Sequence, residues 1–256
     1  MIKWFIYHYK VDMVNAELAD YRQYISFNDF FTRKLNNDAR PIVNDRNAIA
    51  SPVDGTVSQA GKISGTDIFQ AKGHTFSLRN LLAGDKEIEN IFDNGHFATL
   101  YLSPKDYHRI HMPIDGQLKK MIYVPGRLFA VNKPAVSNIN QLFARNERVI
   151  SLFETAIGHM AVIKVGALFV ASIDTVWAGQ ISPTKQRQIR SFQYNQPDHD
   201  IKLKKGQELG RFNMGSTVIL LFQSGRIEWD KTMAADRPIT MGQLIGTSVD
   251  RSSVEK

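Results

Sequence analysis

Short apolar runs separated by turn residues fill most of the chain. Six of these runs have the length of β-strands and are rich in valine, isoleucine, leucine and phenylalanine, with Gly, Pro and Asp-Gly pairs between them. Long helical patterns do not alternate with the runs, so a doubly wound parallel sheet is not expected. The pattern predicts a mainly β (α+β) fold with an antiparallel β core. The predicted strands are Phe97–Leu102, Lys119–Val124, Val149–Phe153, Met160–Val165, Ala167–Ile173 and Thr217–Phe222.

The N-terminal part has a different pattern, which predicts short helices. Ser26 to Asp29 resembles a capping box before an aromatic pair, and a second short helix is predicted from Ser77 to Leu82. We therefore expect an N-terminal helical region, residues 1–45, followed by a β domain, residues 46–256. Within that domain the polar segment 183–205 is expected to form an irregular surface excursion.

Composition and charge narrow the classes of protein. The 256 residues contain no cysteine, which excludes disulfides, thiolate nucleophiles and thiolate metal sites. The net charge of +7 favours polyanionic partners, but no recognisable nucleic-acid-binding module accompanies it, so a nucleic-acid partner is not expected. An anionic membrane surface remains as the expected polyanionic partner, although no apolar run approaches the roughly 20 residues that span a bilayer. Residues 1–10, aromatic with a lysine near each end, fit an interfacial helix and a core-docked helix equally well.

Three segments carry groups that can do chemistry. In the first, Asp54 lies in a tight turn before a strand-like stretch, and taken alone it is a turn aspartate that bonds its own backbone. The second contains His108 and His111, which would share a face on a helix and point to opposite sides on a strand. No further ligand pattern accompanies them, so general acid or base chemistry is favoured over metal binding, and one of the two can be structural.

The third segment, Gly215-Ser216-Thr217, runs directly into an apolar strand. Such a sequence is usually a plain turn before a strand. It can also be a strained peptide in which the hydroxyl of Ser216 is aimed at the carbonyl of Gly215. A phosphate-binding loop is excluded because its lysine and its spacing are missing.

The order of these three segments and of several others resembles that of bacterial phosphatidylserine decarboxylases over nearly the whole chain. Met214 replaces the leucine that usually precedes Gly-Ser-Thr, a volume-conserving change that should leave the chemistry unaffected. The chain also starts later than the family pattern, which leaves the strength of membrane attachment open. The further matching segments are Tyr9–Met13, Gln70–His74, Met121–Gly126, Leu142–Val149, Thr175–Gly179 and Lys205–Phe212.

The resemblance implies a proenzyme that cuts itself between Gly215 and Ser216. In the family a Ser-His-Asp charge relay drives this reaction, and the matching positions are Ser216, His111 and Asp54. Ser216 would then become a covalent pyruvoyl cofactor. The pyruvoyl group would form a Schiff base with phosphatidylserine and release carbon dioxide, giving phosphatidylethanolamine.

The resemblance also implies further roles and partners. His108 is the expected proton donor in decarboxylation, His74 is a weaker candidate, and Thr217 is expected to help position the pyruvoyl group. A large chain, residues 1–215, and a small chain, residues 216–256, are expected to stay together as a heterodimer, and a dimer of that pair is left open. The lipid substrate implies peripheral attachment to the cytoplasmic side of the cell membrane. No metal is expected.

The residues leave two other functions open. A pyruvoyl-dependent decarboxylase of a soluble amino acid would share the chemistry of Ser216 but would not need an interfacial N-terminus. A non-catalytic lipid-binding β module would keep Gly215-Ser216 as a plain turn. That module would stay a single chain under denaturing conditions, which distinguishes it from both enzymes.

Overall fold

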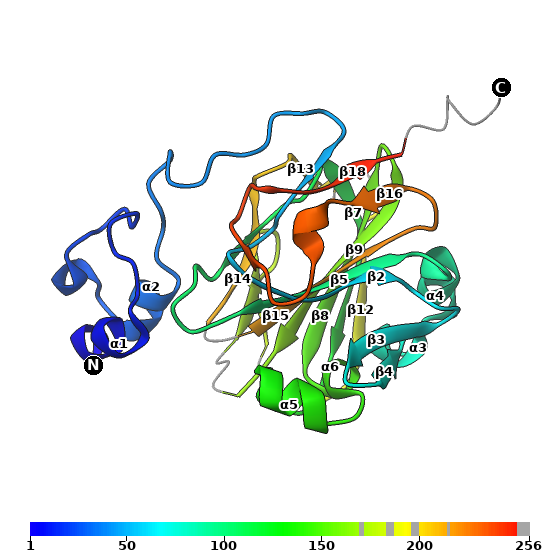
Figure 1. Ribbon diagram of the computed structural model, residues 1–256, viewed down its shortest axis with the longest axis horizontal. Helices are drawn as coiled ribbons and strands as arrows, with labels where there is room; N and C mark the ends of the chain where they lie inside the picture. Colours follow the sequence, from blue (N-terminus) through cyan, green and yellow to red (C-terminus); the bar gives the residue numbers. More distant parts are fainter. Residues whose placement is uncertain (169–171, 183–186, 196–199, 214–215, 250–256) are drawn as a thin grey trace.

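Antiparallel strands build most of the chain that the computed structural model describes, which is residues 1–168, 172–182, 187–195, 200–213 and 216–249 (Figure 1). The largest sheet has nine strands. In spatial order they are β12 (Arg190–Gln193), β7 (Gly116–Val124), β8 (Arg148–Thr155), β9 (Gly158–Gly166), β15 (Ser216–Phe222), β5 (His96–Leu102), β2 (Gly55–Lys62) and β17 (Pro238–Ile239), with β13 (Lys202–Leu203) also paired with β7.

Three smaller sheets accompany the large one, and one hydrophobic core connects residues from much of the chain. A sheet of four strands has the order β11 (Gly179–Ser182), β10 (Ile173–Thr175), β14 (Glu208–Phe212) and β6 (Arg109–His111). A sheet of three strands has the order β1 (Ala48–Ala50), β18 (Leu244–Ser248) and β16 (Ile227–Trp229). A hairpin joins β3 (Asp67–Ala71) and β4 (His74–Ser77).

The helices are short, and side-chain caps begin several of them. Ser26 Oγ accepts a hydrogen bond from the backbone N–H of Asp29 (3.0 Å), as the capping-box pattern predicts, and Ser77 caps the second predicted helix in the same way. The helices are α1 (Ile2–Tyr9), η1 (Tyr21–Gln23), α2 (Phe27–Phe31), α3 (Leu78–Leu81), α4 (Lys86–Phe92), α5 (Lys133–Asn138), α6 (Leu142–Arg145) and η3 (Lys231–Met233).

The N-terminal helices form a small apolar cluster of their own. In Figure 1, α1 and α2 lie together to one side of the sheets. Aromatic side chains dominate the cluster, and no helix within the described ranges has both the length and the apolar content to span a bilayer. Its buried members are Phe5, Val11, Tyr24, Phe30 and Phe31.

Strand β15 is paired along both edges, which places residue 216 at the end of an interior strand. Ser216 pairs with Gly166 of β9 on one side and with Leu102 of β5 on the other. The side chains from Val218 to Leu221 have no exposed surface, so the strand is held by ladder hydrogen bonds and by apolar burial together. The continuous apolar run is typical of a strand buried on both faces.

The structure confirms the antiparallel β core and five of the six predicted strands. The prediction of a strand over 167–173 is wrong for the described part of that range, because β9 ends at Gly166 and β10 begins only at Ile173. Residues 169–171 lie outside the described part. Apolar composition reports burial, and the buried Ala167 lies in a connection between two sheets instead of in a ladder.

The prediction of an irregular excursion over 183–205 is wrong for two short stretches, while the other described residues of this range lie outside strands. Strands β12 and β13 lie in this range, and both pair with β7. Their polar residues mislead because an edge strand is solvated on much of its surface and does not need an apolar pattern. The N-terminal region is less helical than its pattern suggests, since turns and extended backbone connect α1, η1 and α2.

One lysine lies entirely inside the fold. Lys164 on β9 has no exposed surface, and its Nζ is 3.4 Å from Ser151 Oγ and 5.1 Å from the ring centre of Trp177. Burial lowers the pKa of Lys164 to about 7, against a smaller opposing effect of the charge of Asp174. The charged form of this side chain therefore destabilises the folded state.

We expect Lys164→Met to stabilise the fold and to change its pH dependence. The folded pKa of about 7 lies below the ordinary 10.5, so the unfolded chain binds more protons between these values and stability rises with pH across that window. Methionine removes this dependence and should raise the free energy of unfolding near neutral pH by a few kcal/mol, on the order of the shift itself. Denaturant unfolding of both proteins in a Ser216→Ala background, across this pH range, measures it. Parallel pH profiles would contradict the explanation.

Candidate active site

Residue 216 anchors the site through its backbone. Ser216 begins β15 between β9 and β5, while Gly215 and the side chain of Ser216 lie outside the described part of the structure. Two segments of the chain carry the candidate functional side chains near this strand end. The segment that follows β5 carries Tyr107, His108 and His111, and the turn before β2 carries Asp54.

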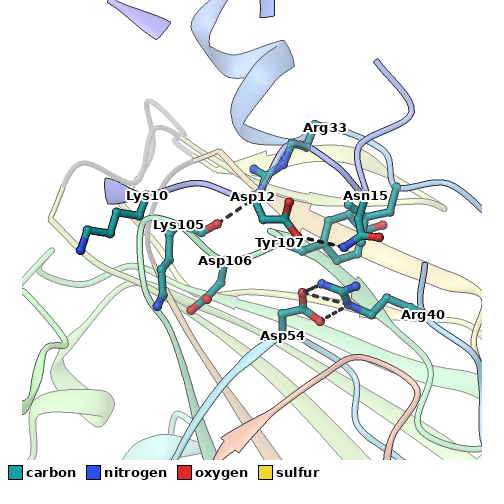
Figure 2. Close-up of a pocket in the computed structure, with 10 residues that line it drawn as sticks. Lys10, Asp12, Asn15, Arg33, Arg40, Asp54, Lys105, Asp106 and Tyr107 are labelled. Carbon is teal, nitrogen blue, oxygen red and sulfur yellow. Dashed lines mark hydrogen bonds and ion pairs between the residues drawn. The ribbon is translucent and has the colours of Figure 1, made fainter. Parts of the chain in front are cut away.

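Asp54 is held by an arginine from the N-terminal connection. Arg40 approaches its carboxylate with two nitrogens, Nε at 2.8 Å and Nη2 at 2.5 Å, and the backbone N–H of Met241 donates to Oδ1 at 2.8 Å (Figure 2). The adjacent Gly55 permits this turn, because a Cβ there would lie 2.3 Å from the carbonyl oxygen of Tyr101. Asp54 is therefore a buried carboxylate that forms an ion pair with one arginine and accepts a hydrogen bond from one backbone N–H.

His111 is oriented by two contacts that fix its tautomer. Its Nδ1 lies 2.7 Å from the carbonyl oxygen of Gly206, and its Nε2 lies 3.0 Å from the hydroxyl of Tyr107. A carbonyl oxygen can only accept, so the Nδ1 atom carries the proton, and in the neutral ring Nε2 accepts from Tyr107. Burial lowers the pKa of His111, which keeps the ring neutral and its Nε2 lone pair basic near neutral pH.

The carboxylate of Asp54 and the imidazole of His111 act on each other through charge. The backbone N–H of His111 donates to the carbonyl of Pro52 at 2.9 Å, which brings the two segments together. Among the described residues the hydrogen bonds of Asp54 go to Arg40 and Met241, and those of the His111 ring go to Gly206 and Tyr107. Burial is the largest effect on the pKa of His111 and lowers it, while the hydrogen bond to Gly206, the charge of Glu208 and, least of these, the charge of Asp54 raise it.

His108 lies just before β6 and occupies a different environment from His111, which ends that strand. It is completely buried, its ring centre lies 4.0 Å from that of Phe31, and its Nδ1 is 2.8 Å from the carbonyl oxygen of Asp106. Burial lowers the pKa of His108 to about 3, and the charge of Arg33 adds to the effect. Since Nδ1 must donate to the carbonyl, Nε2 bears a lone pair, and it has no hydrogen-bond partner within the described ranges.

A cleft of about 210 Å³ opens beside Asp54 and Tyr107 (Figure 2). It lies between the N-terminal segment and the loop that follows β5, and charged side chains dominate its walls. It is lined by Lys10, Asp12, Asn15, Arg33, Leu35, Arg40, Asp54, Lys105, Asp106 and Tyr107.

The sequence interpretation did not find three partners in this site, and it included one residue that lies elsewhere. Arg40 and Gly206 come from connections without a recognisable motif, and Tyr107 was one of several polar groups in a dense segment. His74 lies on β4, paired with Ala71 in the separate hairpin, away from the β6 and β15 ends. The only sequence signal for Tyr107 was its place between the aspartate and the histidines.

Comparison with known proteins identifies close relatives. The family model described as phosphatidylserine decarboxylase matches residues 27–247. The phosphatidylserine decarboxylase proenzyme of Bordetella avium is 53% identical over 245 residues, which cover 96% of this chain and 83% of the relative. The proenzymes of Hahella chejuensis and Pseudomonas aeruginosa strain LESB58 are each 50% identical over 96% of this chain, and the matches cover 82% and 85% of those relatives.

The tautomer of His111 can be tested without any reaction. We expect Tyr107→Phe to raise the pKa of His111 by roughly half a unit to one unit, because the hydroxyl that stabilises the neutral ring is lost. NMR titration of labelled histidines in a Ser216→Ala background measures this, with Tyr101→Phe as the matched control. An unchanged or lower pKa in Tyr107→Phe would show that Nε2 does not accept from the tyrosine.

Proposed function

Because the chain belongs to the phosphatidylserine decarboxylase family, we propose that it cuts itself between Gly215 and Ser216 and then decarboxylates phosphatidylserine to phosphatidylethanolamine. It is accordingly a carboxy-lyase of phospholipid metabolism. The observation that carries the residue assignment is the state of His111, a neutral imidazole whose basic nitrogen is fixed by the carbonyl of Gly206.

Self-cleavage starts with the hydroxyl of Ser216. Its Oγ adds to the carbonyl carbon of Gly215, while Nε2 of His111 takes the hydroxyl proton once the Tyr107 hydroxyl has turned away. The C–N bond between Gly215 and Ser216 then breaks, His111 returns the proton to the nitrogen of residue 216, and the amide has become an ester with a free amine. Asp54 stabilises the imidazolium through its charge, as its effect on the pKa of His111 indicates. Arg40 positions Asp54 for this role.

The ester then breaks on the serine side. Elimination removes the α-proton of residue 216, which the neutral imidazole of His111 takes, and cleaves the Cβ–Oγ bond, so the former hydroxyl oxygen leaves with Gly215 as part of a new carboxylate. Water replaces the nitrogen of the remaining dehydroalanine, and ammonia departs. The products are a large chain, residues 1–215, and a small chain, residues 216–256, which begins with a pyruvoyl group. The paired edges of β15 support continued association of the two chains as a heterodimer.

Two buried polar atoms without hydrogen-bond partners in the described chain bear on the group proposed for position 216, and one of them can donate to its carbonyl oxygens. Thr217 Oγ1 is buried without a hydrogen-bond partner in the described part of the chain, and the hydroxyl can donate to such an oxygen. His108 Nε2 is the second orphaned atom, and it is able to accept a proton. The pyruvoyl group supplies an electron sink for the electron pair that departing carbon dioxide leaves behind.

We assign a proton transfer in decarboxylation to His108. In its resting tautomer Nε2 has no proton to give, so His108 must first accept one, and the ammonium group of the substrate provides it. The low pKa of the buried imidazolium then favours return of this proton to the carbon that lost carbon dioxide. His108 thus acts first as a base and then as the proton donor.

We also propose that residues 1–45 face the membrane, on the cytoplasmic side of the cell membrane, with the protein attached peripherally. The support is the exposed aromatic surface of α1, where Trp4 is 59% and Tyr7 is 86% exposed. Aromatic side chains of this kind favour the headgroup level of a bilayer. The remaining residues, 46–256, form the catalytic β domain in this proposal.

Denaturing intact mass spectrometry tests the self-cleavage. We expect two chains, with the small chain lighter by one ammonia than a peptide 216–256 that begins with serine, and a single uncut chain for Ser216→Ala. Processing in ¹⁸O-labelled water sharpens the test, because the label should enter the pyruvoyl group and not the carboxylate of Gly215.

Label in the Gly215 carboxylate would indicate ordinary hydrolysis and contradict the ester route. A wild-type chain that remains whole after long incubation with anionic lipid would overturn the enzyme and leave the lipid-binding module.

A further inference from the structure

The cleft beside Asp54 contains more positive charge than its own carboxylates neutralise. Its walls present four cationic side chains and three carboxylates, an excess of one positive charge. The cations are Lys10, Arg33, Arg40 and Lys105, and the carboxylates are Asp12, Asp54 and Asp106.

All three carboxylates already have donors. Asp54 is paired with Arg40, and Asp12 accepts from a backbone N–H and a side-chain amide of its own turn at 2.8 and 2.9 Å. Asp106 accepts from both the backbone N–H and the hydroxyl of Ser103, each at 2.7 Å. Burial raises the pKa of Asp106 above its ordinary value. Once Asp54 is paired with Arg40, the charges of Asp12 and Asp106 offset two of the three remaining cations, which leaves an excess of one positive charge in the cleft.

The remaining cations have no such partners. Arg33 is only 4% exposed, yet its Nε has no hydrogen-bond partner in the described chain. Its Nη2 donates to the backbone carbonyl of Lys105 at 3.1 Å, and the guanidinium lies 5.7 Å from the ring centre of Phe30. Lys10 and Lys105 are exposed and form no ion pair within the described ranges. Their side chains extend along the same side of the cleft in Figure 2.

We propose that this cleft is an anion subsite for the phosphodiester of the substrate headgroup, bound by Lys10, Lys105 and Arg33. A buried guanidinium with an unpaired donor is costly until an anion supplies the missing acceptor. Phosphate oxygens suit arginine and lysine donors, and a phosphodiester carries the single negative charge that the cleft lacks. The proposal rests on the proposed function, which it extends by assigning the headgroup its binding residues.

The position of the cleft agrees with the reaction. Asp54 and Tyr107 line it, and the Tyr107 hydroxyl contacts His111. Lys105 follows closely after Leu102, the β5 residue that pairs with Ser216. In the headgroup only the β-carbon of serine separates the phosphate ester oxygen from the carbon that bears the amine. A phosphodiester held in the cleft therefore directs the amine toward the end of β15.

A binding measurement on the uncut chain separates this site from the chemistry. Titration calorimetry of Ser216→Ala with glycerophosphoserine should show binding that Lys10→Gln with Lys105→Gln weakens about tenfold or more. Lys86→Gln, an exposed lysine on α4, is the matched control and should bind as the parent does. Inorganic phosphate should compete with glycerophosphoserine, whereas free serine should not. Equal binding by the double variant, or no competition by phosphate, would overturn the subsite.

Kinetics of the processed protein separate the subsite from attraction to a membrane. With short-chain phosphatidylserine in neutral detergent micelles, the double variant should raise KM about tenfold and leave kcat nearly unchanged. Mass spectrometry should show complete self-cleavage in both proteins.

An effect that appears only on anionic vesicles would assign the lysines to the lipid surface and overturn the proposal. If glycerophosphoserine binds to the uncut chain but no decarboxylation is detected after processing, the anion site stands and the proposed function fails. If decarboxylation is detected but the double variant leaves KM unchanged, the proposed function stands and the anion subsite fails.

Discussion

The double pairing of β15 is the constraint on which the rest of the site depends. Every residue from Ser216 to Phe222 has a ladder partner on both β5 and β9, and the apolar side chains within the strand are buried. This arrangement fixes one end of the proposed scissile peptide while the preceding residues come from another sheet, through β14. It also explains how the two chains produced by a cut at this point can remain associated, since the new terminus would still belong to an interior strand. A blocked α-keto end cannot arise from translation, so the proposed pyruvoyl group would require a precursor that keeps this strand in register through the cut.

The surroundings of the strand end place the two histidines in different chemical states. His111 is partly exposed, and its basic nitrogen accepts a hydrogen bond from the hydroxyl of Tyr107. His108 is sealed against Phe31, so its imidazolium is strongly disfavoured and any proton it takes is readily returned. Because Phe31 belongs to the N-terminal cluster, the proposed membrane-facing region also forms one wall of the catalytic centre. Arg40 provides a second link, from the N-terminal connection to Asp54. In the proposed function, the same N-terminal residues would therefore contact the membrane and support the catalytic side chains.

Much of the fold follows from the sequence, whereas the partners in the site do not. Five core strands were predictable because burial on both faces leaves continuous apolar runs, and Ser77 was predictable because capping is local. The different environments of His108 and His111 did not follow from the sequence, because the pattern left helix and strand open for this segment and His108 lies just before β6. The carbonyl that orients His111 belongs to Gly206, and any residue offers a carbonyl, so no sequence signal marks it. The pairing of Arg40 with Asp54 likewise depends on how a connection without regular structure crosses the sheet.

The division of labour between the two histidines is tested most directly by separating cleavage from decarboxylation. Intact mass and carbon dioxide release would be measured on His108→Asn and His111→Asn prepared in parallel. The account predicts that His108→Asn is cut and carries the pyruvoyl group but releases carbon dioxide at least about a hundredfold more slowly, as expected for loss of a general acid–base group. It predicts that His111→Asn remains a single chain. A His108→Asn protein that decarboxylates normally, or a His111→Asn protein that cuts itself at the wild-type rate, would contradict it.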